Sequence, residues 1–125
     1  MENKKIILSI DDNVVQLKLY QEMLSHRFDF RAVKSASEAL NFLNAIKVDL
    51  ILLDIEMPNI TGFEFLKDIR KIPSYMDVPV IIISGKTGAD FIKEARNSSA
   101  ADVLSKPVNP DDLLSSIERA FTAAT

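Results

Sequence analysis

The sequence contains no cysteine and no tryptophan, and glycine occupies only three of its 125 positions. Without cysteine the chain can form no disulfide bond, no thiolate zinc site and no cysteine nucleophile, which fits a reducing compartment. Uninterrupted apolar runs, such as residues 50–53 and 80–83, are far shorter than the ~18 residues of a membrane span. No apolar stretch near the N-terminus has the length of a signal peptide. We therefore expect a cytoplasmic protein that does not enter a membrane.

An excess of positive charge is also missing. Fifteen Lys and Arg residues stand against 18 Asp and Glu residues, which gives a net charge of −3. Nucleic-acid-binding domains present a basic face, so no direct nucleic-acid partner is expected. The hydrophobic content of 47% and the charged content of 26% are typical of globular proteins. Because the length matches the ~100–200 residues of one domain, we predict a single domain over residues 1–125.

Short apolar runs alternate along the chain with segments of helical period. The expected strands cover residues 5–10, 29–33, 49–54, 78–84 and 102–105, and three of them have continuously apolar centres. Continuous apolar strands are typical of a parallel sheet that is covered on both faces. Between the strands, apolar residues recur every three or four positions on one helix face: Leu17, Tyr20 and Leu24; Ala39, Leu43 and Ile46; Leu113, Ile117 and Phe121. This alternation predicts an α/β fold with a doubly wound parallel sheet and helices on both faces.

Helix starts are marked by residues that favour the N-cap position. Ser35 and Thr61 are each followed three residues later by glutamate, which indicates a capping box. Asn109 precedes a proline and two aspartates, the order expected of an N-cap and a first helical turn. The pattern is weakest over residues 89–98, so we expect the least firmly packed helix there.

Polar residues that can carry chemistry follow four of the predicted strands. Asp11 and Asp12 follow the first, Asp54 ends the third, Ser84 ends the fourth and Lys106 follows the fifth. In doubly wound sheets, ligands bind outside the carboxyl ends of the strands, so these side chains are expected to converge. Crowded carboxylates repel one another unless a cation joins them, and Mg²⁺ is the natural candidate for carboxylate oxygens.

A carboxylate in such a site can act as a nucleophile toward phosphorus and form an aspartyl phosphate. Phosphoryl transfer needs positioning and neutralised charge more than covalent chemistry from the protein. We expect Asp54 to be the nucleophile, because it ends the central buried strand. Mg²⁺, the Lys106 ammonium and the Ser84 hydroxyl would each hold one phosphoryl oxygen.

Taken together, these residues resemble the receiver domain of two-component response regulators. The resemblance is carried by these motifs: Asp11-Asp12, Asp54, Met57-Pro58, Gly62, Ser84 and Lys106-Pro107. It covers essentially the whole chain and implies a five-stranded, flavodoxin-like sheet with strand order 2-1-3-4-5. It also implies a histidine kinase or phosphotransfer protein as phosphoryl donor. The output would be a downstream effector protein or an output domain outside this chain.

The resemblance further implies a role for each site residue. Asp54 would be the phosphoacceptor, Asp12 a direct Mg²⁺ ligand and Asp11 a ligand acting largely through water. The backbone carbonyl of Glu56 would be a further ligand. By the same resemblance, Lys106 would contact the phosphoryl group and Ser84 would move toward it. The peptide bond before Pro107 would be cis.

The chain departs from the family pattern at the position three residues before the lysine. The family usually has an aromatic residue there, whose ring turns inward when the hydroxyl residue moves, but this chain has Val103. A β-branched side chain is stiff and too small for that motion, so the aromatic coupling is not expected. Glu56 and Lys86 stand two residues after Asp54 and Ser84. The resemblance implies that these positions border the site and influence how fast water removes the phosphoryl group, and an opposite-charged pair there would be able to close over it.

Three other functions remain open. A Mg²⁺-dependent phosphohydrolase with an aspartyl nucleophile is one, although the dehalogenase-like Asp-x-Asp motif is not found after the first strand and no cap domain is present. A flavin mononucleotide module is disfavoured, because Asp11 and Asp12 would repel the phosphate. The third is a receiver-like scaffold that relays little, since Val103 replaces the aromatic residue. No turnover of a separate substrate is expected.

Overall fold

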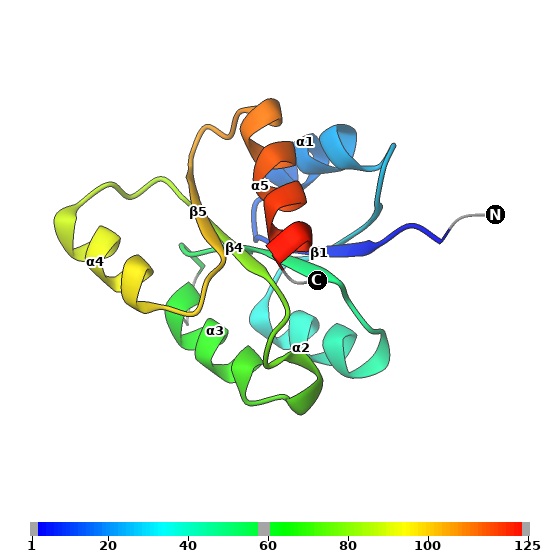
Figure 1. The fold of residues 1–125 in the computed structure, drawn as a ribbon, viewed down its shortest axis with the longest axis horizontal. Coiled ribbons are helices and arrows are strands. Elements are labelled where there is room, and N and C mark those ends of the chain that lie inside the picture. Colours follow the sequence, from blue (N-terminus) through cyan, green and yellow to red (C-terminus); the bar gives the residue numbers. More distant parts are fainter. Residues whose placement is uncertain (1–2, 58–60, 124–125) are drawn as a thin grey trace.

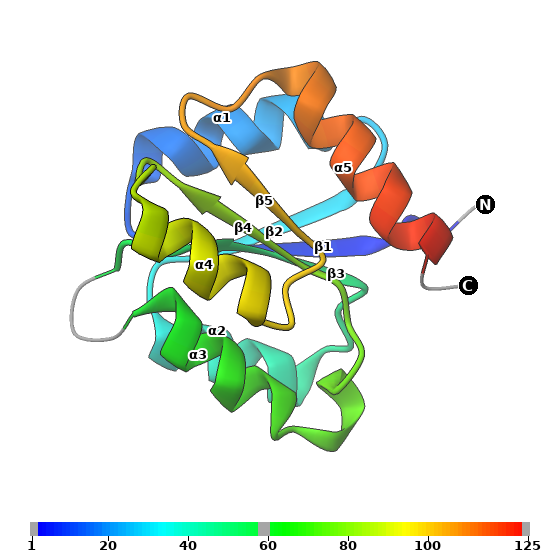
Figure 2. The ribbon, with the colours of Figure 1, turned by 60° about the vertical axis from the view of Figure 1, so that its left-hand side comes forward.

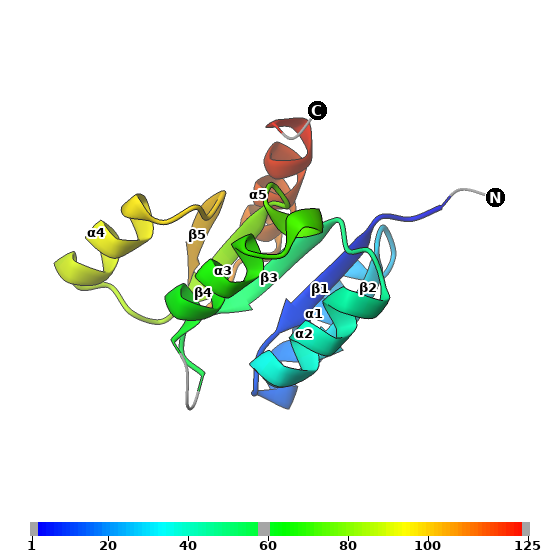
Figure 3. The same cartoon turned by 90° about the horizontal axis from the view of Figure 1, so that it is seen from below.

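The computed structural model describes residues 3–57 and 61–123. Pro58, part of the Met57-Pro58 motif, lies outside the described residues. Helices surround a central sheet (Figure 1). Its five parallel strands lie in the order β2-β1-β3-β4-β5, as the resemblance implied (Figure 3). The strands are β1 (Ile6–Ile10), β2 (Asp29–Val33), β3 (Leu50–Asp54), β4 (Val80–Ser84) and β5 (Asp102–Ser105).

Every strand ends at the predicted residue, but three begin later than predicted. β1 and β3 each start one residue later, and β4 starts at Val80 rather than at residue 78. Pro79 precedes β4 and has no N–H to donate to a neighbouring strand, although its carbonyl accepts from the Ile51 N–H at 3.0 Å. β3 and β4 are buried along their whole length, as the continuous apolar runs predicted.

Five α-helices connect the strands: α1 (Val14–Leu24), α2 (Ala36–Ala45), α3 (Gly62–Arg70), α4 (Ala89–Asn97) and α5 (Pro110–Ala123). A 3₁₀ turn, η1 (Pro73–Tyr75), was not predicted. The predicted helix caps are confirmed. Ser35 accepts from the Glu38 N–H, Thr61 accepts from the Glu64 N–H, and Asn109 accepts from two first-turn N–H groups. The prediction that Ile46 continues the apolar face of α2 was wrong, because the helix ends at Ala45. Ile46 is extended, with φ −133°, and caps α2.

The helices cover both faces of the sheet. α1 and α5 pack on one face, around Tyr20, Leu24 and Leu113, while α2, α3 and α4 lie on the other (Figures 2 and 3). α4 has a single buried residue, Ala95, and no side-chain hydrogen bond caps its start at Gly88. The weak pattern over residues 89–98 therefore corresponds to the least firmly packed helix.

The start of α3 is held against the end of β3 through Gly62. Its N–H donates to the Ile55 carbonyl at 3.2 Å. A Cβ atom at this position would lie 2.4 Å from Ile55 Cδ1 and 2.7 Å from Ile55 Cα, so only glycine allows the approach. Among the described residues, no helix is both long enough and apolar enough to cross a membrane.

Candidate functional site

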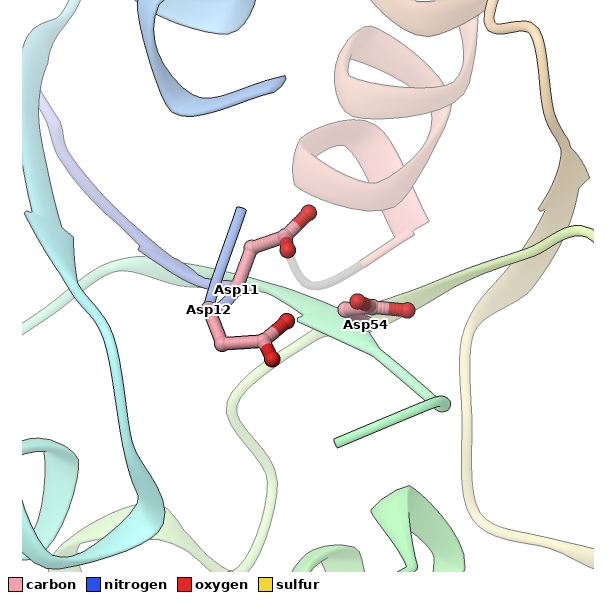
Figure 4. A group of neighbouring side chains, drawn as sticks. All are labelled: Asp11, Asp12 and Asp54. Atoms are coloured by element: carbon pink, nitrogen blue, oxygen red, sulfur yellow. The ribbon is translucent and has the colours of Figure 1, made fainter. Parts of the chain in front are cut away.

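Three carboxylates gather at the carboxyl edge of the sheet. Asp11 and Asp12 follow β1, and Asp54 ends the neighbouring strand β3. Each offers a carboxylate oxygen, and these oxygens lie within 4.8 Å of one another (Figure 4). Asp11 and Asp54 are buried, with 1% and 4% of their surfaces exposed, whereas Asp12 is exposed. The predicted convergence of these residues is therefore present in the fold.

Asp11 is only partly satisfied by hydrogen bonds. Its Oδ1 accepts from the Asn13 N–H at 2.9 Å, while Oδ2 is buried without a partner. Burial, followed by the charge and proximity of Asp54, raises the pKa of Asp11 from 3.8 to about 6. Without a nearby cation, the charged form of the Asp11 carboxylate is therefore disfavoured at this position.

Asp54 is held by groups from two other segments. Its Oδ1 accepts from the Glu56 N–H at 3.1 Å and lies 3.3 Å from Lys106 Nζ. The Lys106 N–H in turn donates to the Ser84 carbonyl at 2.9 Å, which ties the start of the β5–α5 loop to β4. The Lys106–Pro107 peptide bond is cis, as the resemblance implied. A carboxylate oxygen of Asp54 thus lies beside an ammonium group and the acidic cluster.

Ser84 lies at the end of β4 and is bonded to Glu56. The Ser84 hydroxyl donates to Glu56 Oε1 at 3.1 Å, and the Gly85 N–H donates to the same oxygen at 2.7 Å. The Gly85 N–H, the Ser84 hydroxyl and the cationic groups of Lys106 and Lys86 lower the pKa of Glu56. Although the Lys86 charge acts on Glu56, the two side chains form no close ion pair in the part of the chain that the structure describes. The Lys86 N–H instead donates to Ser84 Oγ at 2.9 Å.

Three contributions to this site did not follow from the sequence. The first is the hydrogen bonding of the Glu56 side chain, which was placed at the border of the site but not with Ser84 and Gly85 as partners. The second is Asn13, whose side chain caps α1 and whose N–H binds Asp11. An asparagine just before a helical pattern signals such a cap. The third is Tyr20, whose buried hydroxyl has no partner and whose pKa is raised by burial and by Asp11 and Asp54. Apolar periodicity does not reveal such a hydroxyl.

Val103 is half-buried on β5 and packs against the cluster that contains α2, α3 and α4. It lines a groove of about 370 Å³ between α4 and β5, together with Phe91, Ile92 and Ala95. The surface beside Val103 is therefore hollow.

The donor set fits Mg²⁺. It consists of carboxylate oxygens, which are hard ligands, and one of them, Asp11 Oδ2, is buried without a hydrogen-bond partner. A cation at this point would also offset the repulsion between Asp11 and Asp54. The arrangement places a buried carboxylate, an ammonium group and an acidic cluster at one edge of the sheet, the kinds of group that phosphoryl transfer requires.

Comparison with known proteins supports the resemblance. The family profile described as "Response regulator receiver domain" matches residues 7–118. The two-component response regulator ARR5 of Arabidopsis thaliana is 30% identical over 92% of this chain and 73% of that protein. A protein-glutamate methylesterase/protein-glutamine glutaminase of Clostridium acetobutylicum is 32% identical over the whole of this chain, which spans 39% of that protein.

Solved structures agree with the sequence comparison. A CheY-like receiver domain protein from Methanospirillum hungatei JF-1 is 26% identical, with a TM-score of 0.89 over 98% of this chain and 97% of that chain. The chemotaxis protein CheY4 of Vibrio cholerae is 27% identical, with a TM-score of 0.87 over 94% and 98% of the respective chains. The match to the family profile over nearly all of the chain, and the fold it shares with these structures, lead to one conclusion: the chain belongs to the response regulator receiver domains of two-component systems.

Proposed function

We propose that this domain is a phosphorylation-dependent signalling switch with Asp54 as its phosphoacceptor. The observation that carries the proposal is the placement of Asp54 Oδ1 3.3 Å from Lys106 Nζ, beside the carboxylates of Asp11 and Asp12. The carboxylate is buried within hydrogen-bond reach of its neighbours yet opens onto the edge of the sheet where ligands bind. Of the described carboxylates, only Asp54 both contacts the Lys106 ammonium group and belongs to the acidic cluster.

In the proposed reaction, a carboxylate oxygen of Asp54 attacks the phosphorus atom of a phosphohistidine. A P–O bond forms, the P–N bond breaks, and the imidazole nitrogen keeps the electron pair and takes up a proton. Mg²⁺, when bound, neutralises charge on the phosphoryl oxygens. Asp12, Asp11 and the backbone carbonyl of Glu56 are the groups proposed to hold it. Lys106 would bind a second phosphoryl oxygen, and the Ser84 hydroxyl a third.

The proposed donor is a histidine kinase or phosphotransfer protein in the cytoplasm. The reader of the phosphorylated state would be an effector protein or an output domain. The chain spans less than half of the methylesterase relative, so that protein's activity is not transferred to this domain. Turnover of a separate substrate is not part of the proposal, and neither is direct contact with nucleic acid.

The test is the intact mass of the protein after incubation with acetyl phosphate, with and without Mg²⁺. The wild type is expected to gain one phosphoryl group only when Mg²⁺ is present, with acetate as the leaving group. Asp54→Asn should gain none, because the amide is a poor nucleophile. Asp77→Asn is the matched control, since Asp77 is an exposed aspartate away from the cluster, and it should behave as the wild type.

Two outcomes would contradict the proposal. The first is an adduct that persists in Asp54→Asn, which would place the modification elsewhere. The second is the absence of both the adduct and beryllofluoride binding in the wild type, which would leave a scaffold that is not phosphorylated. Continuous hydrolysis of small phosphate esters would instead favour the phosphohydrolase alternative.

A further inference from the structure

The single proton of the Ser84 hydroxyl is already engaged in this structure. It donates to Glu56 Oε1 at 3.1 Å and accepts from the Lys86 N–H at 2.9 Å. The Gly85 N–H donates to the same Glu56 oxygen at 2.7 Å. Ser84 is 1% exposed, so these contacts leave its hydroxyl little access to solvent. One carboxylate thus takes two neighbouring donors at the end of β4.

A phosphoryl group on Asp54 would need the same donors, the Ser84 hydroxyl and the Gly85 N–H, that Glu56 now holds. Glu56 follows Asp54 by two residues, and its N–H already donates to Asp54 Oδ1 at 3.1 Å. A phosphoryl group on Asp54 would carry about two negative charges next to the Glu56 carboxylate. Like charges at this range repel, and the Ser84 hydroxyl has one proton to donate. Glu56 and the phosphoryl group therefore compete for the same donor.

We propose that the Glu56 side chain is an internal competitor of the phosphoryl group, which holds Ser84 and Gly85 in the unphosphorylated arrangement and has to leave before Ser84 can bind a phosphoryl oxygen. This inference rests on the proposed function. Glu56 is here a positioning residue, because it acts through Ser84 and through the loop of residues 85–88.

The release of Glu56 would free the segment that carries α4. Residues 85–88 are exposed and lead directly into α4, which has only Ala95 buried and no side-chain cap. A cavity of about 820 Å³ lies beside this loop, between α3 and α4, and leaves room for the loop to move. In a chain with Val103 in place of an aromatic residue, Glu56 links the phosphoacceptor segment to the loop that leads into α4, and this link does not need a turning ring.

The test is the affinity for beryllofluoride at saturating Mg²⁺, followed by calorimetry or by the amide spectrum. Beryllofluoride is the probe because it mimics the phosphoryl group without being hydrolysed. Glu56→Ala is expected to bind about tenfold more tightly than the wild type, because no charged hydrogen bond has to be broken. Glu56→Gln keeps an acceptor oxygen but not the charge, so it should lie between the two. Glu22→Gln changes an exposed glutamate on α1 and should leave the affinity unchanged.

A double-mutant cycle with Ser84→Ala separates the contact from simple charge repulsion. If Glu56 acts through Ser84, the gain from Glu56→Ala should fall to less than about threefold once the hydroxyl is removed. A gain of the same size in both backgrounds would show only long-range repulsion and would overturn the proposal. Without beryllofluoride, the amide resonances of Gly85 and Lys86 should move in Glu56→Ala, and unmoved resonances would also overturn it.

The outcomes distinguish this inference from the proposed function. Equal beryllofluoride affinity in the wild type and in both Glu56 variants would reject the competitor role and leave the phosphorylation switch intact. Failure of every protein to bind beryllofluoride would reject both. Circular dichroism confirms folding of each variant, and a large loss of structure is not expected at an exposed position such as Glu56.

Discussion

The replacement of Asp11 by asparagine should stabilise the protein in the absence of Mg²⁺. Asp11 is 1% exposed, and its pKa is raised from 3.8 to about 6, by burial first and by Asp54 next. One pH unit of difference between folded and unfolded pKa values corresponds to about 1.4 kcal/mol, so the charged carboxylate weakens folding by on the order of 3 kcal/mol. Asparagine removes the charge but keeps the oxygen that accepts from the Asn13 N–H. The expected gain in the free energy of unfolding is about 2–3 kcal/mol at pH 8.

The pH dependence follows from the direction of the pKa change. Because the folded pKa is raised, the folded protein binds more protons than the unfolded chain between about pH 4 and pH 6. The contribution of Asp11 to stability therefore falls as the pH rises through this window, and the penalty is fully present above it. The difference between Asp11→Asn and the wild type should be near zero at about pH 4 and should reach its full size above about pH 6.5.

Urea unfolding in buffer with EDTA, at several pH values, measures this difference. Asp77→Asn is the matched control and should change the free energy of unfolding by less than about 0.5 kcal/mol, because Asp77 is exposed. Mg²⁺ at pH 8 should stabilise the wild type more than Asp11→Asn, because binding to the folded state alone raises its stability. If Asp11→Asn is no more stable than the wild type at pH 8 in EDTA, burial and the neighbouring Asp54 do not destabilise the charged form of Asp11 as we infer.

Four further substitutions test the packing and the helix capping by urea unfolding. Tyr20→Phe removes a buried hydroxyl without a partner and should leave stability unchanged or raise it by about 1 kcal/mol. Tyr75→Phe is its contrast, because the Tyr75 hydroxyl accepts from the Val48 N–H and shares its single proton between two nearby carbonyls. This variant should lose about 1–3 kcal/mol. Gly62→Ala should lose about 1–3 kcal/mol, since its Cβ would lie 2.4 Å from Ile55 Cδ1, and a neutral result would mean that α3 shifts freely. Asn109→Ala removes the acceptor of two first-turn N–H groups of α5 and should lose about 1 kcal/mol, unless water caps the helix equally well.

Much of the fold follows from local patterns. The apolar runs at residues 50–53 and 80–83 predict buried strands because a parallel sheet covered on both faces has no polar side to accommodate. The N-caps at Ser35, Thr61 and Asn109 are equally local, since each binds an N–H two or three residues away. The strand order, by contrast, came from the resemblance and not from periodicity.

Some boundaries depended on tertiary contacts. The last turn of α2 stops before Ile46, whose carbonyl accepts from the Tyr75 hydroxyl of η1, 29 residues away. Apolar spacing alone extended the helix face to Ile46, because that residue type fits the pattern. No local signal identified η1 itself, which is a single turn of three residues.

In the candidate site, too, some features follow from the sequence and others only from the tertiary structure. Asp11, Asp12, Asp54, Ser84 and Lys106 could be named from the sequence because parallel strands bring their carboxyl ends to one edge, so position along each strand determines proximity. The tertiary structure alone decided three other features. It buries Asp11 Oδ2 and leaves the Tyr20 hydroxyl without a partner. It also gives Glu56 the hydrogen-bond partners Ser84 and Gly85 rather than Lys86. Those contacts depend on side-chain directions and on distances between segments about 30 residues apart, which neither residue type nor periodicity specifies.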